Sequence, residues 1–213
     1  MKKLAIIGAS ELGCLMAHHA ITDNHYHVVG FYDDGAKNSK YFPELPVLGK
    51  IDDVEKDHAS GKFDCIMIGI GYHRMDIRKR VYDRFANKVP FGTIVHSKSF
   101  VDSSCKVGKG VFVLPGCTVD YMASIGNNVT LQIGCVVAHH TIIGDHTFLG
   151  PGVQMAGLIN VHQCCFLGLA CVIKDCLTIG EHAVIGAGAV VISNVDPHTV
   201  STGVPAKVVK DKA

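Results

Sequence analysis

A six-residue repeat runs through the second half of the chain and constrains its fold more than any other feature. Every sixth residue from Val95 to Val191 is aliphatic, over seventeen consecutive positions. The residue two places earlier is mostly small, and glycine often follows the aliphatic one. This period is typical of a parallel β-helix, in which each hexad supplies one short strand and one corner. Because three hexads make a triangular coil of about 18 residues, the sequence predicts between five and six stacked coils.

Each position of the repeat has a predicted role. The large aliphatic residue fills the interior, the small one lies near a corner, and the glycine that follows the aliphatic residue takes up unusual corner dihedrals. Free cysteine packs as a small apolar side chain, and five of the nine cysteines occupy the small position: Cys105, Cys117, Cys135, Cys165 and Cys171. The other four, which are Cys14, Cys65, Cys164 and Cys176, have no such explanation and lie in no nucleophile motif.

The first ninety residues follow a different pattern, in which strands and helices alternate. Apolar runs predict three strands and helical spacing predicts two helices, at 4–8, 28–32 and 65–69 and at 11–22 and 75–86 respectively. This order indicates a parallel sheet covered by helices. We therefore expect a small Rossmann-like α/β domain over residues 1–90. A β-helix domain with a short C-terminal extension follows over residues 93–213.

Charge and cysteine usage exclude several classes of partner. Twenty Lys and Arg against nineteen Asp and Glu give a net charge of +1, which leaves no basic footprint for nucleic acid or an anionic membrane. No apolar run is long enough to span a bilayer, and the N-terminal stretch lacks the apolar length of a signal peptide. The nine cysteines show no C-x-x-C spacing, and in a cytosolic chain they should be reduced. We expect a cytoplasmic protein that inserts into no membrane and binds no nucleic acid.

Histidines gather at one predicted corner of the β-helix. His139 and His140 follow Val137, so they point outward. An imidazole can act as a general base near neutral pH, and a solvated corner histidine is the alternative. Residues eighteen apart stack on one edge, which places Gly157 beside His139 and leaves the edge open for a thin ligand. No histidine of this cluster stacks on another, so we predict no metal site.

A loop from Gly8 to Gly13 joins the first predicted strand to the first helix. Its backbone N–H groups can hold a phosphate or another polar ligand. Ser10 stands where the dinucleotide fingerprint requires glycine, so the loop favours a sugar nucleotide over a redox dinucleotide. Asp33 and Asp34 follow about twenty residues later, where an acidic residue binds a ribose hydroxyl. An ordinary capped turn between strand and helix is the alternative.

Together, the GAS-x-x-G loop, the YDD strand end, the IGY-type loop and the segment VVAHHTIIGDH resemble the bacterial sugar acetyltransferases of the left-handed β-helix family. These include the bacillosamine and perosamine N-acetyltransferases, and the sialic-acid O-acetyltransferases share their plan. The resemblance extends to the terminal Gly203–Lys207. It implies a left-handed β-helix, acetyl-CoA as co-substrate, a nucleotide-linked amino sugar as acceptor, and a homotrimer with active sites between subunits.

The resemblance also implies roles for particular residues. His139 matches the general base, and His140 stands where the family often has an acidic partner, so both are catalytic candidates. Asp145 and Asp120 are alternative sources of that carboxylate. The positions implied for acetyl-CoA are Gly157, Leu169, Ala187, Gly188, Lys207 and Phe148. Those implied for the sugar nucleotide are Ser10, Glu11, Leu12, Asp33, Asp34 and Gly71. The family often has histidine at the positions of Leu12 and Phe148, which are apolar here.

The predicted reaction is direct acetyl transfer from acetyl-CoA to a UDP-, GDP- or dTDP-linked 4-amino sugar in a ternary complex. His139 takes the proton, and a backbone N–H such as that of Gly157 stabilises the oxyanion. No cysteine or serine is placed to carry the acyl group. Two alternatives stay open. One is a sugar O-acetyltransferase of the sialic-acid type, and the other is a non-catalytic trimer that binds a sugar nucleotide or CoA.

Overall fold

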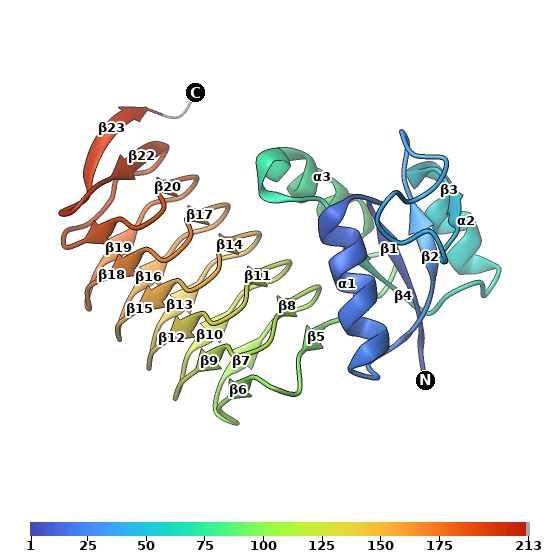
Figure 1. Cartoon of the computed structure of the whole chain (residues 1–213), viewed down its shortest axis with the longest axis horizontal. Coiled ribbons are helices and arrows are strands. Elements are labelled where there is room, and N and C mark those ends of the chain that lie inside the picture. Colours follow the sequence, from blue (N-terminus) through green and yellow to red (C-terminus); the bar gives the residue numbers. More distant parts are fainter. Residues whose placement is uncertain (212–213) are drawn as a thin grey trace. The chain divides into compact units, whose positions relative to one another are not determined.

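The computed structural model describes residues 1–211 and divides the chain into two compact units. The first is Met1–Ile94, and the second begins at Val95. Figure 1 shows a sheet with helices in the first unit and a stack of regular coils in the second.

The first unit is a four-stranded parallel sheet in the order β3-β2-β1-β4. Its strands are β1 (Lys3–Ile7), β2 (His27–Tyr32), β3 (Val47–Gly49) and β4 (Cys65–Ile68). Its helices are α1 (Glu11–Thr22), α2 (Val54–Ala59) and α3 (Met75–Phe85), with the short 3-10 turns η1 (Ile51–Asp53) and η2 (Tyr72–Arg74). The five elements predicted from the sequence are confirmed to within one residue at each end. Sequence analysis missed β3 and α2, because three and six residues are too short to show a period.

Alternate residues of β1 point to opposite faces of the sheet. Ala5 and Ile7 pack with Phe85 of α3 in one buried cluster. Ile6 points the other way, where Gly13 of α1 lies against it. The helices therefore cover both faces, and the ends of the strands stay open to form a crevice.

The second unit is a parallel β-helix of seventeen two-residue strands spaced six residues apart, and it ends in a hairpin. Strands three apart pair with an offset of eighteen residues, as Val136 does with Thr118. The eight-stranded face contains β5 (Ile94–Val95), β8 (Phe112–Val113), β11 (Thr130–Leu131), β14 (Phe148–Leu149), β17 (Phe166–Leu167), β20 (Val184–Ile185), β22 (Thr199–Thr202) and β23 (Lys207–Asp211). The six-stranded face contains β6 (Phe100–Val101), β9 (Thr118–Val119), β12 (Val136–Val137), β15 (Gln154–Met155), β18 (Val172–Ile173) and β21 (Val190–Val191). The five-stranded face contains β7 (Lys106–Val107), β10 (Ser124–Ile125), β13 (Ile142–Ile143), β16 (Asn160–Val161) and β19 (Thr178–Ile179).

The aliphatic positions fill the interior as predicted, except in the first coil. They are buried from Val113 to Val191. Val95 and Val101 are only partly buried, and Val107 is 36% exposed. The first coil of the β-helix has a neighbouring coil on one side only, so its interior residues are less covered.

The small positions carry a hydrogen-bond ladder that the sequence did not reveal. The Cys135 thiol donates to the Gly150 carbonyl at 3.2 Å, and the Thr141 hydroxyl to the Ala156 carbonyl at 3.1 Å. The same donation to the carbonyl fifteen residues later occurs at Ser99, Cys105, Cys117, Thr147 and Cys165. These cysteines therefore tie successive coils together as well as filling space.

The glycines that follow the aliphatic positions correct one expectation. None of these glycines has the positive φ of a strained corner that was expected of it. They are Gly108, Gly126, Gly144, Gly150, Gly168, Gly180 and Gly186. They are required because the next coil lies close. A Cβ on Gly150 would lie 2.8 Å from the Leu169 nitrogen, and one on Gly168 would lie 2.7 Å from the Ala187 nitrogen.

The left-handed backbone occurs two residues further on, at every sixth residue from Gly110 to Gly188, with φ between 53° and 75°. Most of these residues are not glycine, and they include Cys164 and Cys176, two of the cysteines that had no explanation, and His140. A side chain in this conformation costs free energy. Bonds between coils offset that cost, as when the His140 N–H donates to the Tyr121 carbonyl at 2.9 Å.

Candidate functional site

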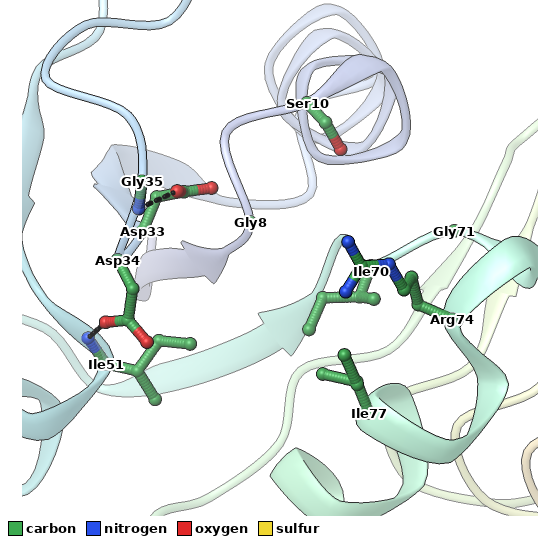
Figure 2. Close-up of a pocket in the computed structure, with 10 residues that line it drawn as sticks. All are labelled: Gly8, Ser10, Asp33, Asp34, Gly35, Ile51, Ile70, Gly71, Arg74 and Ile77. Carbon is green, nitrogen blue, oxygen red and sulfur yellow. Dashed lines mark hydrogen bonds between the residues drawn. The ribbon is translucent and has the colours of Figure 1, made fainter.

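A polar hollow of about 400 Å³ lies at the carboxyl ends of the parallel strands in the first unit. Its lining is Gly8, Ser10, Asp33, Asp34, Gly35, Ile51, Ile70, Gly71, Arg74 and Ile77, which follow all four strands (Figure 2). The side chains of Ser10 and Arg74 point into the space between the loops (Figure 2). Open α/β sheets bind ligands at this place, where the strand order reverses.

Close backbone contact between glycines shapes this hollow. Gly8 has a φ of +105°, and a Cβ on Gly13 would collide with the Gly8 carbonyl. A Cβ on Gly69 would in turn collide with the backbone of Gly13. The Gly69 N–H also donates to the Ile7 carbonyl at 2.7 Å. These contacts hold the ends of β1 and β4 and the start of α1 together.

Backbone amides engage both aspartates of the hollow. Asp33 accepts from the N–H groups of Ala9, Gly35 and Ala36, each at 2.9 Å. Burial raises the pKa of Asp33, but these three donors outweigh it and leave the pKa below its ordinary value. One oxygen of Asp34 accepts from the backbone of η1 at 3.0 Å. The carboxylates therefore shape the loops of the hollow.

Four of the six residues predicted for the sugar nucleotide line this hollow, namely Ser10, Asp33, Asp34 and Gly71. The other two do not. Glu11 accepts from the Tyr41 hydroxyl at 2.7 Å beside a second hollow, and Leu12 is only 8% exposed. Sequence analysis missed Arg74, the cation of the lining. Its signal was a basic residue in the short loop that follows β4.

The histidine corner of the second unit lies between β12 and β13. His139 and His140 are both exposed, and their Nδ1 atoms lie 3.2 Å apart. Their ring planes make an angle of 84°. The Tyr121 ring of the preceding coil packs edge-on against His140, with centroids 5.4 Å apart. Because the Nδ1 atoms are within hydrogen-bond distance, one ring donates its N–H to the other.

Gly157 in the next coil gives the His139 ring its space. A Cβ there would lie 2.6 Å from His139 Nε2, so no larger residue fits without moving the ring. Gly157 is buried, yet within residues 1–211 its N–H donates no hydrogen bond. The base candidate thus lies beside a donor that is available to a ligand oxygen.

Neither aspartate considered as a partner for His139 bonds to it. Asp145 accepts from the backbone N–H of Asn127 at 2.6 Å and also from its side-chain amide. The Asp120 side chain has no hydrogen bond within the described part of the chain. The ring partner of His139 is therefore His140.

Four of the six residues predicted for acetyl-CoA lie on two different edges of the β-helix. Gly157 shares the edge of His139, between the six- and five-stranded faces. Leu169 and Ala187 lie in successive coils on the edge between the six- and eight-stranded faces, where both are exposed, and Gly188 follows Ala187.

An apolar hollow of about 480 Å³ lies on the six-stranded face between these two edges. Its lining is Val136, Gln154, Met155, Ala156, Val172, Ile173, Lys174, Asp175, Val190 and Ile192. None of the six positions predicted for acetyl-CoA lines this hollow. Phe148 is buried on β14 with its ring centroid 6.1 Å from that of Phe166, and Lys207 is the exposed first residue of β23.

Among residues 1–211, no three His, Cys, Asp or Glu side chains gather in a way that could hold a metal ion. Over the same residues, the helices are too short or too polar to cross a bilayer.

Two family profiles match the chain. The PglD N-terminal domain matches residues 3–85, and the bacterial transferase hexapeptide (six repeats) matches residues 122–157. A search of curated proteins gave no match. The two profiles confirm the resemblance seen in the sequence, since together they describe both of its units.

Solved structures extend the likeness over nearly the whole chain. PerB from Caulobacter crescentus, in complex with CoA and GDP-perosamine, is 24% identical with a TM-score of 0.88, and the match covers 99% of this chain and 98% of that one. The acetyltransferase domain of PglB from Neisseria gonorrhoeae is 23% identical with a TM-score of 0.89, covering 98% and 100%. WeeI from Acinetobacter baumannii is 22% identical with a TM-score of 0.77, covering 98% and 100%. These likenesses confirm the predicted fold, an α/β unit followed by a left-handed β-helix.

Proposed function

We propose that this chain, in which a PglD N-terminal domain precedes bacterial transferase hexapeptide repeats, transfers the acetyl group of acetyl-CoA to the amine of a nucleotide-linked amino sugar. One observation carries the proposal. The His139 ring lies against Gly157, whose N–H donates no hydrogen bond within residues 1–211, so a base and a candidate oxyanion donor meet at one place. Similar structures hold CoA with GDP-perosamine and acetyl coenzyme A, which supports these substrate classes.

In the proposed step, the sugar amine attacks the thioester carbonyl and forms a C–N bond. The Gly157 N–H donates to the carbonyl oxygen as negative charge develops there. His139 takes the amine proton at Nε2 and returns it to the sulfur as the C–S bond breaks. The products are an N-acetyl sugar and free CoA thiol, so no covalent acyl-enzyme is needed.

The hollow of the first unit suits the nucleoside diphosphate of such a substrate. Arg74 supplies positive charge, and Ser10, the N-cap residue of α1, belongs to the same lining. The second oxygen of Asp34 suits a ribose hydroxyl. Asp33 keeps the loops in place through its three backbone bonds.

A second copy of the chain completes the active site in this proposal. A ligand that lies along one edge meets either His139 and Gly157 or Leu169 and Ala187, unless neighbouring copies bring the two edges together. The resemblance implies a homotrimer. Sedimentation equilibrium should therefore give the mass of three chains, and a monomer at assay concentration would contradict this part of the proposal.

We place the reaction in the cytoplasm. All nine cysteines are free, and most are buried, which suits a reducing compartment.

Release of free thiol from acetyl-CoA tests the activity. The panel contains UDP-, GDP- and dTDP-linked 4-amino sugars, with the matching hydroxy sugars and free sialic acid as controls. Release that requires an amino sugar is the expected result. Release only with a hydroxyl acceptor would favour the O-acetyltransferase, and acetyl-CoA binding without any release would favour a binding protein.

A further inference from the structure

We propose that His140 is a positioning residue that fixes the proton of His139 without contributing a negative charge. The proposal rests on the function proposed above. Its basis is the Nδ1–Nδ1 distance of 3.2 Å between the two rings, in a place where no carboxylate among residues 1–211 bonds to His139.

The proposed role of His139 as a base at Nε2 determines where the protons of the pair lie. To accept a proton at Nε2, neutral His139 must carry its own proton on Nδ1. The Nδ1–H of His139 then donates to Nδ1 of His140, which carries its proton on Nε2. The opposite arrangement would place a proton on Nε2 of His139 and remove its capacity as a base. The hydrogen bond of the pair must therefore run from Nδ1–H of His139 to Nδ1 of His140.

The backbone and the neighbouring ring hold His140 in this orientation. Its φ of 57° lies in the left-handed region, and its N–H donates to the Tyr121 carbonyl at 2.9 Å. The Tyr121 ring packs edge-on against the imidazole. His140 therefore reaches His139 from a turn that is bonded to the preceding coil.

Few charged groups surround the pair. The coil before it contributes the Tyr121 hydroxyl and, one residue earlier, Asp120. The coil after it contributes Gly157, which has no side chain, and Leu158. Asp175 follows on the same edge two coils beyond His139. The group in hydrogen-bond contact with His139 is the ring of His140.

A neutral partner suits an amine acceptor better than a hydroxyl. An amine attacks through its lone pair, and its N–H becomes acidic only as the C–N bond forms, so a modest base is enough. A hydroxyl must lose its proton as it attacks, which requires a base strengthened by a carboxylate. The imidazole pair therefore favours N-acetylation by this site.

Three substitutions at His140 separate the hydrogen bond from the charge. His140→Ala removes the acceptor and keeps a residue that this turn position already accepts at Ala170. His140→Asn restores a neutral acceptor, and asparagine tolerates the left-handed region. His140→Asp supplies a charged acceptor. His182→Ala is the matched control, since it removes a histidine from the equivalent turn position at another corner, where φ is 59°.

Turnover of acetyl-CoA with GDP-perosamine or another active amino sugar gives the first measurement. We expect His140→Ala to lower kcat by about tenfold or more with KM changed less than about threefold, because the base is no longer oriented. His140→Asn should recover most of that loss. His140→Asp should move the midpoint of the kcat–pH profile upward by about one unit, because a carboxylate favours the imidazolium. His182→Ala should match the unmodified protein.

The tautomer of His139, read from ¹⁵N NMR of the histidine-labelled full chain, gives a measurement that needs no substrate. The Nδ1–H form is expected in the unmodified protein and in His140→Asn, and the Nε2–H form in His140→Ala. An unchanged tautomer in His140→Ala, an Asn variant as slow as the Ala variant, or an unmoved pH midpoint in His140→Asp would each overturn the proposal. If the tautomer switches but no amino sugar releases thiol, the proposed function fails and the positioning role stands.

Discussion

The two units of this chain position their candidate functional residues by different physical means. In the β-helix, every coil repeats after eighteen residues, so a residue's place on an edge follows from its number. In the α/β unit, the hollow is made by loops after four strands of different lengths, and no period relates them. A single atom added on the β-helix edge should therefore lower activity strongly. A single substitution in the α/β hollow should lower activity less, because several loops share the binding of one ligand.

Loss of the His139 imidazole should have the largest effect. We expect His139→Ala to lower kcat by about 10²–10⁴-fold, since general-base catalysis contributes on that order. KM for acetyl-CoA should change little. Steady-state thiol release, with the melting temperature as a check on folding, gives both quantities. A loss of kcat below threefold would show that His139 is not the general base and would favour substrate-assisted transfer.

A single methyl group on the edge should come next. In Gly157→Ala, the new Cβ would lie 2.6 Å from His139 Nε2, so the ring has to move. We expect kcat to fall by about 10²-fold, the cost of a base displaced by about 1 Å. The control is Gly134→Ala, whose Cβ meets no atom within 4 Å and whose turn position is alanine at Ala170. Equal activity in the two variants would show that catalysis tolerates displacement of the His139 ring.

The same contrast explains what the sequence could and could not predict. The stacking of Gly157 on His139 and the burial of the aliphatic positions from Val113 to Val191 followed from counting alone. The role of the repeat glycines did not, because the spacing does not distinguish close approach from a left-handed turn. Arg74 was missed for another reason. The sheet order brings its loop beside Ser10 and Asp34, and that order depends on contacts between segments far apart in the chain.

Removal of the cation from the α/β hollow should give a smaller and different effect. We expect Arg74→Ala to raise KM for the sugar nucleotide by about tenfold, which matches about 1.5 kcal/mol for one charge-assisted hydrogen bond. The kcat value and the KM for acetyl-CoA should stay within about twofold. Arg80→Ala is the matched control, because Arg80 is an exposed arginine that pairs with Asp76 at 3.4 Å on the same helix. A fall in kcat without a change in KM would place Arg74 outside nucleotide binding.

The smallest expected effect concerns the stability of the α/β hollow and its dependence on pH. Asp33→Asn leaves a poorer acceptor for the N–H groups of Ala9, Gly35 and Ala36, so the free energy of unfolding at pH 7 should fall by about 1 kcal/mol.

The pKa of Asp33 lies below its ordinary value in the folded chain. The carboxylate therefore stabilises the fold fully above the unfolded pKa, about 3.9, and loses that contribution as the pH falls through the folded pKa. The difference between the two proteins should be constant above about pH 5 and shrink below about pH 4. Urea unfolding from pH 7 to pH 3 measures it, with Asp76→Asn as the control for an exposed carboxylate on α3. A difference that stays constant down to pH 3 would show that the loop amides do not depend on the charge of Asp33. The close glycine contacts alone would then fix the shape of the α/β hollow, just as the eighteen-residue register alone fixes the positions of residues on the β-helix edge.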